Sequence, residues 1–215
     1  MIQENKSPKR EYIFINNNDE SDKIFNELKA KLKDANIVLI SQKLDLDKVG
    51  AEDEYNLVKN KTKFAFETLK KPVIYGEYFI RFSAISNFPG IFSDWFINNI
   101  NNEKIHELLD PHTNIGMQTI FYFGIYDSTI KFKNEGDNND LLIGVGNNDE
   151  PVMIEHIVDG RFVLPFDKEY KNIDDIFQPT GWNKTVSKLN DSEIKLATAV
   201  PRAINHLVEV LTKYV

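Results

Sequence analysis

The fold is decided by residues 72–96, PVIYGEYFIRFSAISNFPGIFSDWF. Pro72–Tyr75 opens with a continuous apolar run, which is typical of a strand buried on both faces. A Pro-Gly turn later breaks the chain, and a helix presenting Phe92, Trp95 and Phe96 follows it. The stretch therefore predicts a buried strand, a loop and a helix entered through a tight turn.

The same alternation of strand and helix precedes this stretch. Tyr12–Ile15 and Ile37–Ile40 are further buried-strand runs. Each is followed by apolar residues at helical spacing: Ile24, Phe25, Leu28 and Leu32 after the first, and Leu57, Val58, Ala65 and Leu69 after the second. Alternation of this kind predicts a mixed α/β sheet flanked by helices.

The second half of the chain turns towards β structure. Residues 117–126 read as a long strand, and a closing helix is predicted to start near Pro201. Residues 133–150 hold a short apolar run between two turn-forming stretches, which predicts an extra hairpin or a floppy insertion. We expect residues 1–10 to form a flexible tail and residues 11–215 to form one domain of two lobes around a central cleft.

Composition excludes several classes of protein. The chain has 215 residues, 41% of them hydrophobic, and no cysteine, so neither disulfides nor a thiolate zinc site are expected. The formal net charge of −7 argues against a nucleic-acid surface, which needs clustered Lys and Arg. No apolar run approaches the roughly 18–20 residues that cross a bilayer. These features predict a soluble cytoplasmic protein that binds neither nucleic acid nor membrane.

Three segments, taken together, resemble the inosine triphosphate pyrophosphatase family. The first is residues 72–96, with its Phe88-Pro89-Gly90 turn, and the second is Asp159-Gly160-Arg161-Phe162-Val163-Leu164-Pro165. The third runs from Asp174 to Thr185, DDIFQPTGWNKT. The resemblance covers roughly residues 12–213 and implies that family's two-lobed fold.

The resemblance also implies an activity. The family cleaves unusual purine nucleoside triphosphates, such as those of inosine and xanthosine, to the monophosphate and pyrophosphate with magnesium. Its phosphate loop, Thr/Ser-Gly-Asn-x-x-Lys, corresponds here to Asn16, Asn17 and Asn18, with Ser21 in place of the lysine. Lys23 is two residues away, which turns it about 200° around a helix. The alternative is an ordinary helix start capped by Asp19 or Ser21.

The resemblance places further charged residues near the phosphates. Asp47 and Lys59 fall where the family has an acidic residue and a lysine, although both types are also common on surfaces. The family's paired carboxylates, which hold magnesium and activate water, are reduced here to Glu77. Glu77 and Asp47 are thus the candidate catalytic and metal-binding residues, and they predict weak binding of magnesium.

The base pocket differs most from the family. Asp174 keeps its type, but the preceding aromatic residue is Ile173, which removes a stacking interaction worth roughly 1–3 kcal/mol. The family's Ser-His-Arg is replaced by Thr198, Ala199 and Val200. We also expect Pro201 to move Val200 out of helical geometry.

Two hypotheses follow. The first is a non-catalytic binding or assembly protein, with a nucleotide-like ligand in the cleft or a partner on the apolar stretch Phe88–Phe96. Family members pair through this region, so a homodimer is the specific expectation. The alternative is an active nucleoside triphosphate pyrophosphatase with a rebuilt magnesium site, made from Asp47, Glu77, Asp174, Lys23, Lys59 and Lys195.

Overall fold

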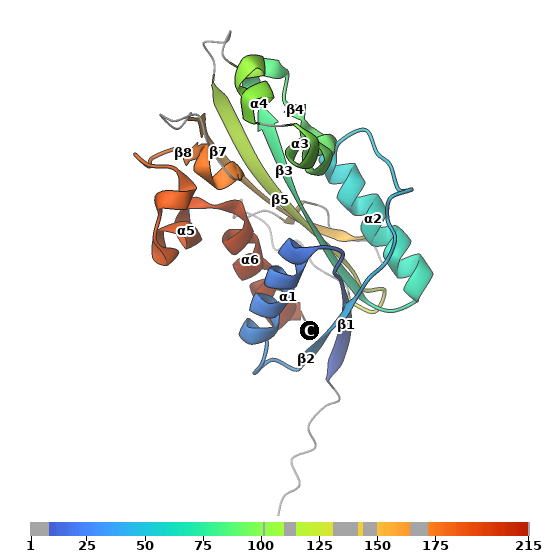
Figure 1. The fold of residues 1–215 in the computed structure, drawn as a ribbon. Coiled ribbons are helices and arrows are strands. Elements are labelled where there is room, and N and C mark those ends of the chain that lie inside the picture. The colour runs from blue at the N-terminus through green and yellow to red at the C-terminus, as the bar shows by residue number, and fades with distance from the viewer. Residues whose placement is uncertain are drawn as a thin grey trace, which may run out of the picture.

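One sheet organises the chain, which is seen in a computed structural model that describes residues 9–100, 102–109, 115–130, 142–143, 150–163 and 172–214. The sheet has eight strands in the order β2-β1-β3-β5-β7-β6, with β4 paired to β3 and β8 paired to β7. Helices cover both faces (Figure 1). The predicted mixed α/β fold is confirmed.

The N-terminal part contributes the parallel edge of the sheet. It contains β1 (Arg10–Ile15), α1 (Asp19–Lys31), β2 (Ile37–Gln42) and α2 (Glu54–Leu69). Strand β1 pairs in parallel with both β2 and β3. Arg10, which was predicted to lie in the tail, belongs to β1, because its backbone pairs with Ile37 of β2. Its guanidinium also binds Asp127 in two places, at 2.9 and 3.0 Å.

Three long antiparallel strands form the middle of the sheet. They are β3 (Val73–Phe82), β5 (Gly116–Tyr126) and β7 (Val152–Phe162). The predicted third strand ended at Tyr75, and this was too short. Strand β3 continues to Phe82 because every residue from Val73 onwards has a partner in β5, so Glu77 lies inside the strand, opposite Tyr122.

The remaining elements are short strands, short helices and the long closing helix α6. They are η1 (Ser83–Ile85), β4 (Phe88–Pro89), η2 (Gly90–Phe92), α3 (Ser93–Asn99), α4 (Asn102–Leu109), β6 (Leu142–Ile143), η3 (Ile173–Asp175), β8 (Phe177–Pro179), η4 (Val186–Lys188), α5 (Asp191–Ala197) and α6 (Ala199–Tyr214). Within the predicted 133–150 hairpin, β6 pairs antiparallel with β7, and the rest lies outside the described residues apart from Glu150.

The start of α6 corrects one expectation. Val200 was predicted to leave helical geometry because Pro201 follows it, yet α6 begins at Ala199 and includes both. Proline is tolerated in the first helical turn, where its missing N–H has no partner within the helix.

Two apolar clusters fill the two faces of the sheet. Helix α2 packs on one face through Leu57, Val58 and Ala65. Helices α1 and α6 cover the other face, through residues such as Leu28 and Leu207 (Figure 1). Within the described ranges, no helix is long and apolar enough to cross a membrane.

Two glycines explain the motifs that carry the family resemblance. Gly90 has φ = +55°, and a Cβ there would lie 3.0 Å from Glu54 Oε1, so the Pro-Gly turn needs a glycine. Gly160 pairs with Pro179, and a Cβ there would lie 2.4 Å from the Gln178 carbonyl oxygen. The second and third motifs therefore contain neighbouring strands, and the missing side chain of Gly160 lets β7 and β8 approach closely.

Candidate ligand-binding cleft

A cleft of about 1180 Å³ opens between α1, the middle of the sheet, η3 and the start of α6. Its floor includes Tyr78 from β3, Thr119 from β5 and Phe177 from β8. The charged residues that line it are Asp19, Glu20, Lys23, Glu27, Asp94 and Asp174. Five carboxylates and one lysine give this lining a formal net charge of −4.

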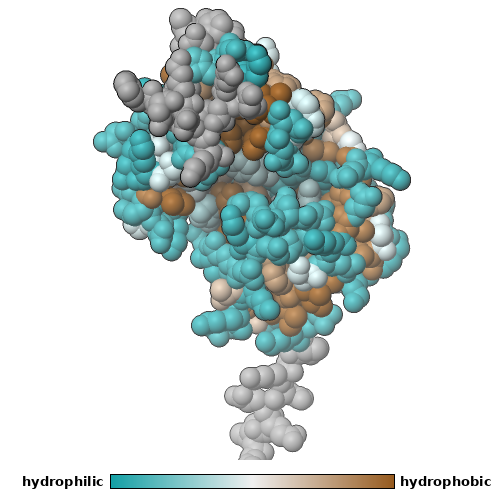
Figure 2. All heavy atoms as spheres, in the orientation of Figure 1, coloured by the Kyte–Doolittle hydropathy of each residue, from teal (hydrophilic) through white to brown (hydrophobic). Residues whose placement is uncertain are grey.

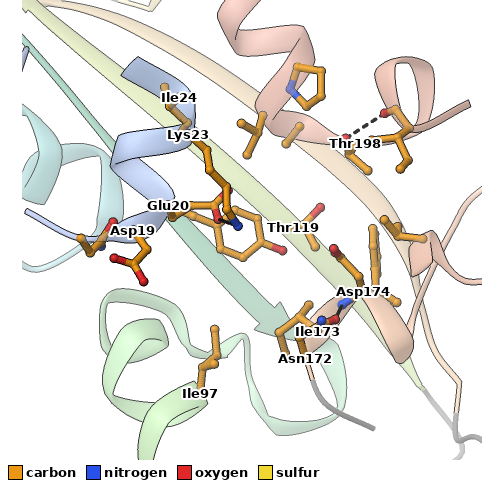
Figure 3. Close-up of a pocket in the computed structure, with 18 of the residues that line it drawn as sticks. Asp19, Glu20, Lys23, Ile24, Ile97, Thr119, Asn172, Ile173, Asp174 and Thr198 are labelled. Atoms are coloured by element: carbon orange, nitrogen blue, oxygen red, sulfur yellow. Dashed lines mark hydrogen bonds and ion pairs between the residues drawn. The ribbon is translucent and has the colours of Figure 1, made fainter. Parts of the chain in front are cut away.

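Of the predicted site residues, Asn18, Lys23 and Asp174 line the cleft. Figure 3 shows Lys23 reaching from α1 into the space beside Glu20, with Thr119 and Asp174 on the facing side. The helical rotation predicted that Lys23 would point away. Instead, Lys23 lies on the same face of α1 as Glu20, Ile24 and Glu27, which also line the cleft, and its Nζ lies 3.4 Å from Glu20 Oε2.

The three asparagines after β1 make structural hydrogen bonds, although the buried Oδ1 of Asn16 has no partner among the described residues. Asn16 donates through Nδ2 to Asp22 and to Ser41 Oγ, joining α1 to β2. Asn17 donates to the Leu44 carbonyl at 2.9 Å and accepts from the Leu44 N–H at 3.1 Å. Asn18, rather than the predicted Asp19 or Ser21, caps α1 by accepting from Ser21 N at 2.9 Å.

The first turn of α1 is therefore unlike a phosphate site. Its cap is filled by the Asn18 side chain, and Asp19, Glu20 and Asp22 already place negative charge at the positive end of the helix dipole. A phosphate at this helix start would meet repulsion from three carboxylates instead of an open set of N–H groups.

Burial and nearby carboxylates raise the pKa values of Asp174 and Tyr78. Burial, followed by the charges of Glu20 and Asp175, raises the pKa of Asp174, while Lys23 lowers it less. Asp174 keeps contact with water, yet the concave wall crowds its carboxylate with protein atoms. Burial also raises the pKa of Tyr78, and the charge of Asp174 adds to the effect. Both groups thus favour their protonated, less negative forms.

The wall beside α6 is neutral. Thr198, Ala199 and Val200 line the cleft, as the resemblance predicts for these positions. The Thr198 hydroxyl donates to the Ile194 carbonyl at 2.8 Å, and Ala199 is 1% exposed. These residues place no cation against the cleft.

Glu77 belongs to a second polar group, on the α2 face of the sheet. Lys61 Nζ lies 2.9 Å from both Glu77 carboxylate oxygens, and the Tyr75 hydroxyl donates to Oε2 at 2.7 Å. Burial, then Glu77, raises the pKa of Tyr75, and Asp94 and Asp47 contribute through their charges.

Lys61 was missed by the sequence reasoning, which favoured Lys59. The two lysines are two residues apart on α2, so they leave the helix about 200° apart. Lys61 faces Glu77, whereas Lys59 joins Lys63 at Glu150, at 3.0 and 2.9 Å. Lys195 lies exposed in the last turn of α5, and neither it nor Lys59 lines the cleft.

The residues at the predicted magnesium site do not fit the ion. Magnesium needs octahedral oxygen ligands at about 2.0–2.1 Å, and both Glu77 oxygens already face the Lys61 ammonium. Across the described part of the chain, no group of three or more His, Asp or Glu side chains could hold a metal ion. The Lys61 ammonium supplies the positive charge beside Glu77.

The apolar stretch Phe88–Phe96 presents three exposed aromatic side chains, whereas Phe96 is buried. Phe88, Phe92 and Trp95 are 39%, 56% and 55% exposed. Phe88 and Trp95 line a groove of about 460 Å³ together with Phe96, Ile100, Lys104, Glu107 and Leu108. Figure 2 shows hydrophobic atoms gathered near the top of the molecule, in the region of α3 and α4.

Comparisons with known proteins agree with the fold and the motifs. The sequence pattern of the Ham1 family matches residues 13–210. The inosine triphosphate pyrophosphatase of Scheffersomyces stipitis is 27% identical over 182 residues, covering 84% of this chain and 80% of that protein. The inosine triphosphate pyrophosphatase of Yarrowia lipolytica is 24% identical over 181 residues, covering 82% and 80%.

Solved structures with the same fold include two bacterial proteins. A HAM1 protein from Coxiella burnetii matches with a TM-score of 0.70 and 17% identity, covering 95% of this chain and 99% of that chain. The Ham1 protein of Staphylococcus aureus matches with a TM-score of 0.69 and 20% identity, covering 94% and 98%.

Proposed function

The chain belongs to the Ham1 family, and we propose that it is a non-catalytic binding protein, which keeps the family fold and holds a ligand in the cleft. The observation that carries the proposal is the charge of the cleft. Five carboxylates face one lysine, and that lysine is paired with Glu20. A nucleoside triphosphate brings about four negative charges, and each charge-assisted hydrogen bond it lacks forfeits about 1.5–3 kcal/mol.

The group around Glu77 supports the same proposal. A carboxylate that activates water or holds magnesium must have accessible lone pairs. Lys61 and Tyr75 hydrogen-bond to both Glu77 oxygens, at 2.7 to 2.9 Å, so a metal ion or a water would compete with these donors. In this arrangement Glu77 anchors α2 to β3, and catalysis would require the pair to open.

The alternative is an active nucleoside triphosphate pyrophosphatase of the same fold. It is favoured by the relatives, which are named inosine triphosphate pyrophosphatases. It would require magnesium and a site rebuilt from Glu77, Asp47 and Asp174, with Lys23, Lys59 and Lys195 as cations. Of these six residues, Lys23 and Asp174 line the cleft.

Pyrophosphate release separates the two functions. The purified chain is given the triphosphates of inosine, xanthosine and deoxyuridine with magnesium, at neutral and alkaline pH, beside Glu77→Gln and the exposed control Glu52→Gln. We expect no release above buffer from any of the three proteins. Release that is lost in Glu77→Gln, retained in Glu52→Gln and accompanied by unchanged circular dichroism would establish the alternative.

We further propose that a second copy of the chain covers the groove at Phe88 and Trp95. Exposed aromatic side chains of this size are typical of interfaces. Light scattering at micromolar concentration should give the mass of a dimer, and Trp95→Lys should give a monomer. Leu196, which is 65% exposed on α5, supplies the control Leu196→Lys. A monomeric wild type would remove the homodimer and leave another protein as the partner.

The predicted cytoplasmic location stays a prediction, which fluorescence microscopy of the tagged chain would test.

A further inference from the structure

Two histidines from distant parts of the chain meet where α6 packs on β7. His156 Nε2 lies 3.3 Å from His206 Nδ1, and the two ring planes cross at 89°. His156 belongs to β7 and His206 to α6, so their contact joins the sheet to the closing helix. Neither residue lines the cleft. The pair is therefore separate from the candidate ligand-binding site.

The distance between the two nitrogens fits a tetrahedral metal ion. Zinc binds imidazole nitrogens at about 2.0–2.1 Å, and two ligands of a regular tetrahedron are then about 3.3–3.4 Å apart. A hydrogen bond is the other explanation, but N–H donors usually lie about 2.7–3.2 Å from oxygen acceptors, so 3.3 Å is long for one. The ring torsion of histidine is broad, so small rotations aim both lone pairs at one ion.

The surroundings of the pair give an ion both support and access. Ile154 and Val158 lie on the same face of β7 as His156 and belong to the apolar core. On α6, Leu207 follows His206 and is buried. The two histidines themselves are partly exposed. Packing thus holds the two backbones in place, and solvent supplies an entry path for an ion.

The charges beside His206 on α6 do not oppose a cation. Arg202 and Glu209 lie about one turn before and after it. The Arg202 guanidinium donates to the Leu196 carbonyl at 2.9 Å, so its positive charge is turned towards α5. Glu209 is exposed, and its negative charge favours a cation nearby.

We propose that His156 and His206 form a zinc site that joins α6 to β7. Imidazole suits zinc, copper and nickel, whereas magnesium and calcium favour oxygen ligands, and a tetrahedral arrangement favours zinc. Within the described ranges, no third acidic or histidine side chain completes a three-residue site. The ion therefore takes two protein ligands, and water fills the remaining positions. The proposal goes beyond the function of the cleft, because it uses none of the cleft residues.

The test is calorimetric titration of the full chain with zinc chloride at about pH 7.5, where imidazole is mostly neutral. The binding variants are His156→Gln and His206→Gln. The matched control is His106→Gln, which removes a half-buried histidine on α4. We expect saturable binding of one zinc per chain, a Kd raised at least about tenfold in either binding variant, and a change within about twofold in the control.

Three further readouts separate a zinc site from a purely structural contact. The double variant His156→Gln with His206→Gln should bind about as weakly as either single variant, because both act on one ion. The Kd of the wild type should rise as the pH falls through about 6.5, since protonated imidazole cannot bind a metal. Zinc should also raise the urea midpoint of the wild type and of His106→Gln, but not that of either binding variant.

Four results would overturn the proposal. They are no saturable binding up to about 1 mM zinc, an unchanged Kd in both binding variants, equal weakening in His106→Gln, and displacement of zinc by an equal concentration of magnesium chloride. Circular dichroism confirms that each variant is folded. Variants that lose stability while the wild type shows no response to zinc would assign the pair to a hydrogen bond alone.

Discussion

At the scale of single residues, Asp174 should lower the stability of the folded chain. Burial and the charge of Glu20 raise its pKa, so the folded state holds the Asp174 proton more tightly than the unfolded chain does. The resulting penalty is complete above the folded-state pKa and absent below the ordinary value of about 3.8. We predict that Asp174→Asn raises the free energy of unfolding at pH 7, by less than about 1 kcal/mol because the carboxylate keeps contact with water.

Urea unfolding at several pH values measures this difference. The gain from Asp174→Asn should shrink as the pH falls towards 3.8 and vanish below it. Asp34→Asn is the control, since the Asp34 side chain is 90% exposed. A gain that is independent of pH, or one that Asp34→Asn matches, would contradict the role of burial and Glu20.

At the scale of elements, α2 is held to the sheet by ion pairs of unequal depth. The Lys61 and Glu77 side chains are 14% and 20% exposed, whereas those of Lys59 and Glu150 are 30% and 39% exposed. Removing one partner of a buried pair leaves the other charge without compensation, while surface pairs contribute about 0–1 kcal/mol. Lys61→Met should therefore lower the free energy of unfolding by about 2–3 kcal/mol.

Lys59→Met is the matched control, because it makes the same substitution on the same helix. It should cost below about 1 kcal/mol. Equal losses in chemical denaturation would show that the Lys61–Glu77 pair does not anchor α2. Recovery of stability in the double variant Lys61→Met with Glu77→Leu would support the view that the unpaired carboxylate causes the loss.

At the scale of the whole molecule, buried phenols couple stability to alkaline pH. Burial, followed by contributions from nearby carboxylates, raises the pKa of Tyr12, Tyr75, Tyr78 and Tyr122. A phenol whose pKa is raised in the folded state contributes stability that is complete below its unfolded pKa, near 10, and is lost as the pH rises above that value.

We therefore predict that these phenols ionise only when the chain unfolds. The phenolate absorbance should rise in two steps. Exposed tyrosines ionise near pH 10, and the buried ones ionise in a second step at higher pH that coincides with loss of far-ultraviolet ellipticity. The chain unfolded in urea, in which all phenols titrate together, is the control. Reversible ionisation of every tyrosine with ellipticity unchanged would contradict the prediction.

The sequence by itself determined the fold and the family. Buried-strand runs at Tyr12–Ile15 and Ile37–Ile40 became β1 and β2, because these signals depend on neighbouring residues along the chain. The turn at Gly90 and the pairing of Gly160 with Pro179 show why the motifs could be read locally, since each needs a glycine for a steric reason. The family resemblance is confirmed over residues 13–210.

Only the tertiary structure decided the charge of the cleft and the partner of Glu77. Glu20, Asp94 and Asp174 are far apart in the sequence, and they line one cleft only because α1, α3 and η3 lie around the same part of the sheet. Lys61, rather than Lys59, faces Glu77 because one side of α2 packs on β3, and a rotation of two residues separates the lysines. Distances in space decide which charged side chains interact, and the periodicity of the sequence does not give those distances.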